Sequence, residues 1–100
     1  MSQQIIQDAS IVSASRRQVS ISGPGEVIIL DPESSSYYSL DRVGAKVWAL
    51  IQEPRCVADL CADLVNEFEV SLDVMARDLK VLLGELEAAG LVVIVNADDM

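Results

Sequence analysis

The residues best suited to chemistry in this chain are two cysteines and a scatter of carboxylates. Cys56 and Cys61 are its only thiols, and the sequence contains no histidine. On one helix, side chains five positions apart diverge by about 140°, so a disulfide between these two is geometrically disfavoured. Zinc takes about four N, S or O ligands, which two divergent thiols do not supply. We interpret both cysteines as core residues and predict no metal and no cofactor.

Sequence motifs for catalysis are also missing. Without histidine, no serine or cysteine has the usual general base, and no serine is flanked by glycines as in a nucleophile elbow. The phosphate-binding patterns GxxxxGK and GxGxxG do not occur, and Gly23-Pro24-Gly25 indicates a turn because its proline lacks an N–H. The carboxylates are spread along expected helix faces at positions that predict solvation. We therefore predict a small binding protein and not an enzyme.

The charge balance restricts the partners. Seven basic and sixteen acidic residues give a formal net charge of −9, which repels a phosphate backbone and argues against nucleic acid. A neutral or basic partner fits this charge, and so does an acidic surface that only maintains solubility. No apolar run is longer than residues 91–95, far short of the roughly 18 residues that span a bilayer. The N-terminal residues have no basic region or cleavage-like site, which predicts a cytoplasmic protein that makes no membrane contact.

The first half of the chain has the periodicity of β-strands. Apolar and polar residues alternate over residues 19–22, which predicts a half-buried strand. A β-branched run at 27–30 predicts a second strand, and a third is expected at 36–40 after a turn. The short connections predict an antiparallel meander whose third strand lies at an edge, unless residues 1–16 cover it. Either a loose tail or an extra edge strand is compatible with those first residues.

The second half has helical periodicity. Apolar residues spaced i, i+3, i+4 and i+7 predict helices at about 42–52, 56–67 and 72–89. Asp41 is the expected N-cap of the first helix because its carboxylate can accept from free backbone N–H groups. Gly90 is the expected left-handed stop of the last helix.

Together these elements predict an α+β fold, winged-helix-like, with a three-stranded antiparallel sheet followed by three helices. Residues 1–16 form the predicted tail or extra strand, 17–95 the domain, and 96–100 an acidic C-terminal tail. The apolar residues 91–95 are a candidate closing strand. Winged-helix folds often bind DNA, but the helix at 72–89 has more acidic than basic residues and would approach phosphates with net negative charge.

The helix predicted at 72–89 has more apolar surface than one core face requires. Besides its core stripe, Val74, Val81 and Ala88 recur one heptad apart, and Asp78 and Glu85 separate them from that stripe. Two interpretations stay open for this second strip. Either it packs on the strands, or it walls a groove beside the edge strand, where the two carboxylates would meet a basic partner.

Short segments of the chain follow one another in a distinctive order. They are VIILDPE at 27–33, YYSLD at 37–41, GAKVW at 44–48, VADL at 57–60, FEVS at 68–71, DL and LL at 78–79 and 82–83, and GL at 90–91. In this order, over roughly residues 17–93, they resemble the PqqD-like family of peptide-modification chaperones, also called RiPP recognition elements. Residues 34–36 depart from the family pattern, because relatives often have a glycine in this turn.

The resemblance implies a function and a site. Family members bind the leader segment of a ribosomally made precursor peptide and pass it to processing enzymes. The leader adds as a strand against the third strand, in a groove walled by the third helix. The peptide-binding residues implied for this chain are Ser36, Tyr37, Tyr38, Ser39, Leu40, Val74, Arg77, Asp78, Val81, Glu85 and Ala88.

The pathway is a finer prediction. Tyr37, Tyr38 and Trp48 look more like the free-standing members from lasso-peptide clusters, which deliver a leader to a separate cysteine protease. The Asp-Pro-Glu turn at 31–33 is closer to members that serve pyrroloquinoline quinone biosynthesis with a radical-SAM enzyme. We favour the lasso-peptide type. The alternative of a different class is a non-catalytic protein–protein module, such as a homodimer that pairs edge to edge through the third strand.

Overall fold

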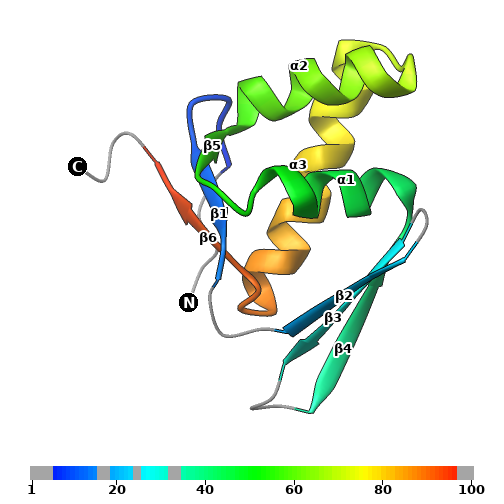
Figure 1. Ribbon diagram of the computed structural model, residues 1–100. Coiled ribbons are helices and arrows are strands. Elements are labelled where there is room, and N and C mark those ends of the chain that lie inside the picture. Colours follow the sequence, from blue (N-terminus) through cyan, green and yellow to red (C-terminus); the bar gives the residue numbers. More distant parts are fainter. Residues whose placement is uncertain (1–5, 16–18, 24–25, 32–34, 97–100) are drawn as a thin grey trace.

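A computed structural model describes the protein over residues 6–15, 19–23, 26–31 and 35–96. In chain order its elements are β1 (Ile11–Ala14), β2 (Val19–Gly23), β3 (Glu26–Asp31), β4 (Ser36–Leu40), α1 (Arg42–Leu50), β5 (Arg55–Cys56), α2 (Val57–Phe68), α3 (Leu72–Ala88) and β6 (Val92–Val95). They form two small antiparallel sheets and three helices (Figure 1). Helix α1 packs on β3 and β4, whereas α2 and α3 contact β5 and β6 of the other sheet. None of the helices in the described part of the chain is long and apolar enough to cross a membrane.

The predicted meander forms one of the two sheets, in the order β2–β3–β4. Central strand β3 buries Val27 and Ile29, and these residues lie opposite Leu40 and Tyr38 of β4. Because residues directly opposite each other share a face of the sheet, that face is the one packed under α1 (Figure 1). The α+β class and a three-stranded antiparallel meander that precedes three helices are therefore confirmed, although the two-residue strand β5 lies between α1 and α2 and strand β6 follows α3.

The turn into β4 contains a residue in the left-handed conformation. Ser35 has φ 59°, and its N–H donates to the carbonyl of Asp31 at 2.9 Å. A side chain in this conformation costs roughly 1–2 kcal/mol, a cost that glycine avoids. This is a physical reason for the glycine that relatives often have in this turn.

The helices begin and end where local capping predicts. The Asp41 carboxylate accepts from the N–H of Gly44 at 3.2 Å, and the Ser71 hydroxyl accepts from the N–H of Val74 at 3.4 Å. Gly90 has φ +79° directly after α3. The predicted N-cap and the left-handed stop are both confirmed, and the helix bounds differ from the predicted ones by one or two residues.

The second sheet has the order β5–β1–β6, with β1 in the centre. Residues 11–14 pair with β6 along their whole length, so this part of the N-terminal segment is an integral strand of a separate sheet and does not cover β4. The buried Ser10 hydroxyl donates to the Asn96 side chain and accepts from the N–H of Gln7 at 2.8 Å. Of the acidic tail predicted at 96–100, residues 97–100 lie outside the described residues.

The core lies between the two sheets and the helices. Its fully buried members come from both sheets and every helix, including Val12, Ile29, Val47, Leu60 and Leu83. Cys61 belongs to this core, while Cys56 is half-buried, and both thiols are free. The interpretation as a core residue is therefore confirmed for Cys61.

Candidate peptide-binding site

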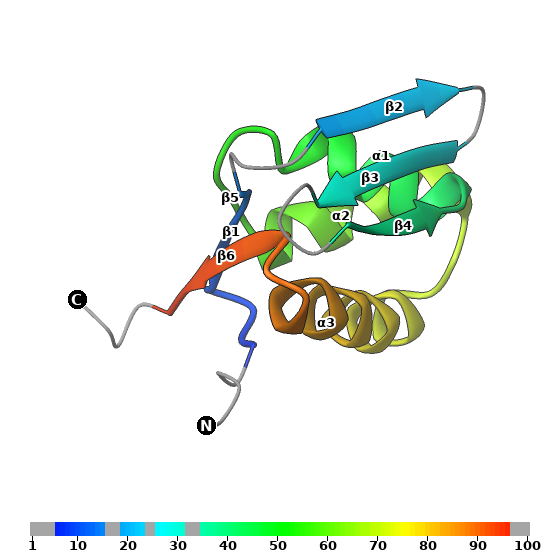
Figure 2. The same ribbon diagram turned by 90° about the horizontal axis from the view of Figure 1, so that it is seen from below.

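The outer edge of β4 has no strand partner in the described part of the chain. Among the described strands, β4 pairs only with β3. Figure 2 shows α3 running alongside β4 on the side away from β3. An edge strand presents backbone N–H and C=O groups that are free to pair with another chain. Helix and strand edge thus border a space in which an extended segment could pair.

A groove of about 750 Å³ lies between the C-terminal end of β4 and α3. Its lining residues are Glu26, Ser39, Leu40, Asp41, Arg42, Val43, Gly44, Val70, Met75, Asp78 and Leu82. Leu40 and Met75 are buried and Leu82 is half-buried, so the floor is apolar. The charged lining residues are three carboxylates and one guanidinium, which favours a neutral or basic occupant.

Close packing of α1 on β4 shapes one end of this groove. A Cβ on Gly44 would lie 3.0 Å from the Cβ of Leu40 and 3.2 Å from its Cδ2. Only glycine allows α1 to start this close to the strand, because the Cβ of Leu40 cannot move without its backbone. The glycine in the GAKVW segment thereby sets the spacing between helix and edge strand.

The structure brings some of the predicted peptide-binding residues together at this groove and separates others from it. Ser39, Leu40 and Asp78 line the groove. Tyr38 lies on the α1 side of the sheet, whereas Tyr37 lies on the opposite face and is 68% exposed. Ser36 provides the first backbone unit of β4.

The remaining predicted residues are on α3 but outside the groove lining. They are Val74, Arg77, Val81, Glu85 and Ala88, and all five are exposed. On a helix of 3.6 residues per turn, the strip of Val74, Val81 and Ala88 is rotated by about 90° from the groove-lining strip. Their part in peptide binding stays a prediction.

Met75 and Leu82 line the groove, although neither is among the residues predicted to bind the peptide. Both belong to the apolar stripe of α3. The local sequence pattern does not distinguish a residue of this stripe that packs against the sheet from one that lines a groove. The available signal is Asp78, which lies three residues after Met75 and four before Leu82 on the same face. A carboxylate within an otherwise apolar face indicates an opening to solvent at that point.

The Cys61 thiol does not line this groove. Burial raises its pKa above the ordinary value, the Asp8 carboxylate raises it further, and the Lys80 ammonium opposes both effects. Lys80 also forms an ion pair with Asp8 at 3.1 Å. A buried thiol with a raised pKa is a poor nucleophile, so the environment of Cys61 is that of a core residue.

An open edge strand that faces a helix across an apolar groove defines a class of domain that takes up extended peptides by strand addition. Residues 26–92, which include both walls of the groove, match the family model for PqqD, described as coenzyme PQQ synthesis protein D. The chain therefore belongs to the PqqD family, and the resemblance found in the sequence is confirmed.

A solved structure of TbiB1 in complex with the TbiA(beta) leader peptide is similar to this protein. The two share 28% sequence identity with a TM-score of 0.75, over 80% of this chain and 93% of that chain. No curated protein matches the sequence.

Proposed function

We propose that this protein binds the leader segment of a ribosomally made precursor peptide as an added strand on β4 and presents it to a processing enzyme. The observation that supports this most directly is the outer edge of β4, which no described strand pairs with and which α3 borders across a groove of about 750 Å³. TbiB1, which has the same fold, was solved with a leader peptide. The protein itself supplies no catalytic step in this proposal, and the encounter takes place in the cytoplasm, where precursor peptides are made.

Recognition in this proposal has two parts. Backbone hydrogen bonds along β4 supply affinity for any extended segment, while the groove selects side chains. Residues of the added strand alternate in direction, so every second side chain faces the apolar floor of Leu40, Met75 and Leu82. The carboxylates of Asp41 and Asp78 then favour basic or neutral residues at the rim.

We favour a lasso-peptide leader protease, a cysteine protease, as the enzyme that receives the leader. The support is the family resemblance of Tyr37, Tyr38 and Trp48. A radical-SAM enzyme of the pyrroloquinoline quinone type is the alternative partner, supported by the turn at residues 31–33. Pull-down of each candidate enzyme by the leader-loaded protein distinguishes the two, because only the true partner binds more tightly when leader is present.

The direct test of leader binding is a fluorescence anisotropy titration. The probes are the fluorescein-labelled TbiA(beta) leader and the labelled leader of any precursor peptide encoded beside this gene. Saturable binding is expected, and Ser39→Pro is expected to abolish it by removing a backbone N–H and stiffening the edge strand. Absence of binding by either leader to the folded protein would refute the proposal.

A matched pair of variants guards against an effect of proline on the sheet itself. Leu82→Gln places an amide on the groove floor, whereas Leu72→Gln makes the same change at an exposed position of α3 outside the lining. We expect the first to weaken leader binding by roughly tenfold, the cost of burying an unpaired amide, and the second to change it little. Equal effects would argue against the groove as the binding surface.

A second copy of this chain is the other strand donor that could pair with β4. Sedimentation equilibrium tests this alternative, a homodimer joined edge to edge. A dimer that the labelled leader converts to a monomer would indicate competition for the same strand edge. A dimer unaffected by saturating leader would use another surface.

A further inference from the structure

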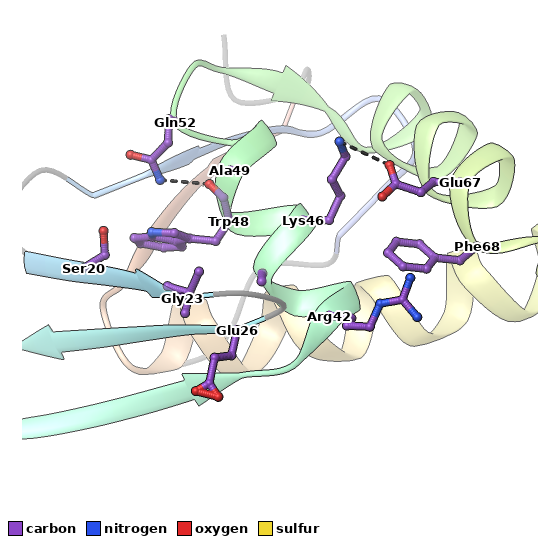
Figure 3. Close-up of a pocket in the computed structure, with 12 residues that line it drawn as sticks. Ser20, Gly23, Glu26, Arg42, Lys46, Trp48, Ala49, Gln52, Glu67 and Phe68 are labelled. Carbon is purple, nitrogen blue, oxygen red and sulfur yellow. Dashed lines mark hydrogen bonds and ion pairs between the residues drawn. The ribbon is translucent and has the colours of Figure 1, made fainter.

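A second hollow of about 590 Å³ adjoins the groove beside β4. It lies between α1, the β2–β3 hairpin and the C-terminal end of α2 (Figure 3). Glu26 and Arg42 line both hollows, so the two meet at these side chains, next to the C-terminal end of β4. A peptide that pairs with β4 and extends beyond Leu40 would arrive at this shared wall.

The second hollow contains a buried donor without an acceptor. Trp48 is 5% exposed, and its Nε1 has no hydrogen-bond partner among the described residues. Figure 3 shows its indole between the side chains of Ser20 and Gln52, which are both exposed. Gln52 uses its own Nε2 to donate to the Trp48 carbonyl at 2.8 Å and leaves the indole unpaired. Buried polar groups in folded proteins almost always have a partner, so an orphan N–H lining a hollow points to an absent acceptor.

Arg42 is a second group in the hollow that lacks an anionic partner. Its guanidinium lies over the Phe68 ring, 5.3 Å from the centroid, and no carboxylate of the described residues is within ion-pair distance of it. Lys46 nearby is already paired with Glu67 at 3.2 Å. Glu26 also lines the hollow, but Figure 3 shows its carboxylate directed away from the Arg42 guanidinium. The hollow therefore has two unpaired donors at opposite ends, the Trp48 indole beside Ser20 and Gln52 and the Arg42 guanidinium over the Phe68 ring.

We propose that the peptide bound along β4 continues past Arg42 into the second hollow, and that this flanking segment presents an acidic residue next to an apolar one. The inference rests on the proposed function and adds a second specificity site to it. The acidic side chain pairs with Arg42, and the apolar side chain lies against Phe68. A carbonyl of the segment accepts from the Trp48 indole once the side chain of Ser20 or Gln52 turns aside.

The two hollows then select opposite charges along one peptide. Glu26 and Arg42 line both hollows, and the groove beside β4 adds the carboxylates of Asp41 and Asp78, so it suits basic residues. The charged residues that the second hollow adds are Lys46 and Glu67, which pair with each other, so its Phe68 end leaves Arg42 for an acidic residue. Such a charge pattern sets the direction and register of an added strand, which backbone hydrogen bonds alone leave loosely specified.

The test uses the single tryptophan of the chain. ¹⁵N-labelled protein gives one indole N–H signal in a two-dimensional spectrum, and that signal moves downfield when the proton is hydrogen-bonded. The probes are the shortest leader peptide that binds and two versions of it, each extended at one end by the native flanking residues. We expect one extended peptide to move the indole signal and to bind roughly tenfold more tightly than the short one, as about one added charge-assisted hydrogen bond predicts.

Variants separate the second hollow from the groove beside β4. Trp48→Phe keeps an aromatic ring and removes the N–H, so it should reduce the affinity advantage of the extended peptide and leave the short peptide unaffected. Phe68→Leu serves as a second variant should Trp48→Phe fold poorly. Arg55→Gln is the control, because Arg55 pairs with Asp63 at 2.7 Å and lines neither hollow. Replacing the acidic flanking residue of the peptide with its amide should lower the affinity of the extended peptide by about as much as Arg42→Gln does. The two changes together should lower that affinity no further, because they remove the same ion pair.

The outcomes distinguish this inference from the proposed function. If the short peptide binds and neither extension adds affinity or moves the indole signal, the inference is overturned and the proposed function stands. An equal indole shift with the short peptide also overturns it, because no flanking segment is then needed. A shift produced by the processing enzyme without any leader overturns the assignment to the leader. If no peptide binds, both proposals fall.

Discussion

Reversing one charge at the groove should weaken a basic leader by an amount that electrostatics predicts. Asp78 lines the groove, and its side chain is 66% exposed, so lysine fits there without burial. For a leader cation about 6 Å away in water, the change from −1 to +1 alters the interaction by about 1.4 kcal/mol. Screening at about 0.15 M ionic strength, with a Debye length of about 8 Å, reduces this to about 0.65 kcal/mol, or a threefold loss of affinity.

Glu85→Lys is the matched comparison on the same helix, because Glu85 is also a predicted peptide-binding residue but lies outside the groove lining. Glu85 is exposed, makes the same charge change and does not line the groove. It lies seven residues from Asp78, about 10 Å along the helix axis, which places it about 12 Å from the same cation. The same screened calculation gives about 0.15 kcal/mol, or a 1.3-fold effect.

Anisotropy titrations of both variants, with one basic and one neutral leader, measure these ratios. Asp78→Lys should weaken the basic leader about threefold at about 0.15 M salt and less than about 1.5-fold at about 1 M, where the Debye length is about 3 Å. The neutral leader should bind both variants like the parent. Equal losses of affinity for Asp78→Lys and Glu85→Lys, or a loss that salt does not reduce, would show that Asp78 does not interact electrostatically with a basic residue of the leader in the groove.

Two further predictions concern the framework of the site. Gly44→Ala should lower the melting temperature by about 4–8 °C, because about 1–3 kcal/mol of overpacking against Leu40 outweighs a gain of about 1 kcal/mol in helix propensity. Gly84→Ala should raise the melting temperature by a similar amount, because its Cβ would meet only the Ile6 side chain, at 3.9 Å. Thermal melts followed by circular dichroism compare the two, and equal shifts would contradict the close approach at Gly44. For Cys61, whose folded pKa is raised above the ordinary value of 9.0, the unfolded chain loses its thiol proton first. Stability should therefore fall as pH rises above about 9, by more than in Cys61→Ala, and urea unfolding at pH 7 and pH 10 measures that difference.

Much of the fold could be predicted because it depends on interactions between close neighbours in sequence. The caps at Asp41 and Ser71 and the left-handed Gly90 act within three or four residues of their partners, so the helix ends appear in the sequence. Alternation and short turns likewise determine the β2–β3–β4 meander. The short connections also predicted the edge position of β4, provided that residues 1–16 did not cover it, and the structure pairs residues 11–14 with β6 instead.

The second sheet was not predictable in this way. Strand β1 is four residues long, and its partner β6 lies near the other end of the chain. A strand that short has no decisive period of its own, and its pairing depends on whether a distant apolar strand is brought beside it. Bringing two such distant strands together has an entropic cost that the packed core between them must offset. No local sequence pattern predicts that core.

On α3, some features follow from the sequence and others only from the tertiary structure. The sequence by itself determined that α3 is a helix with excess apolar surface and that Asp78 lies beside an apolar stripe. Only the tertiary structure decided that Met75, Asp78 and Leu82 face the groove while Val74 and Val81 face outward. The rotation of α3 about its axis is set by how Leu79, Leu83 and Leu86 pack into the core, and periodicity alone leaves that angle undetermined by about one residue, or 100°.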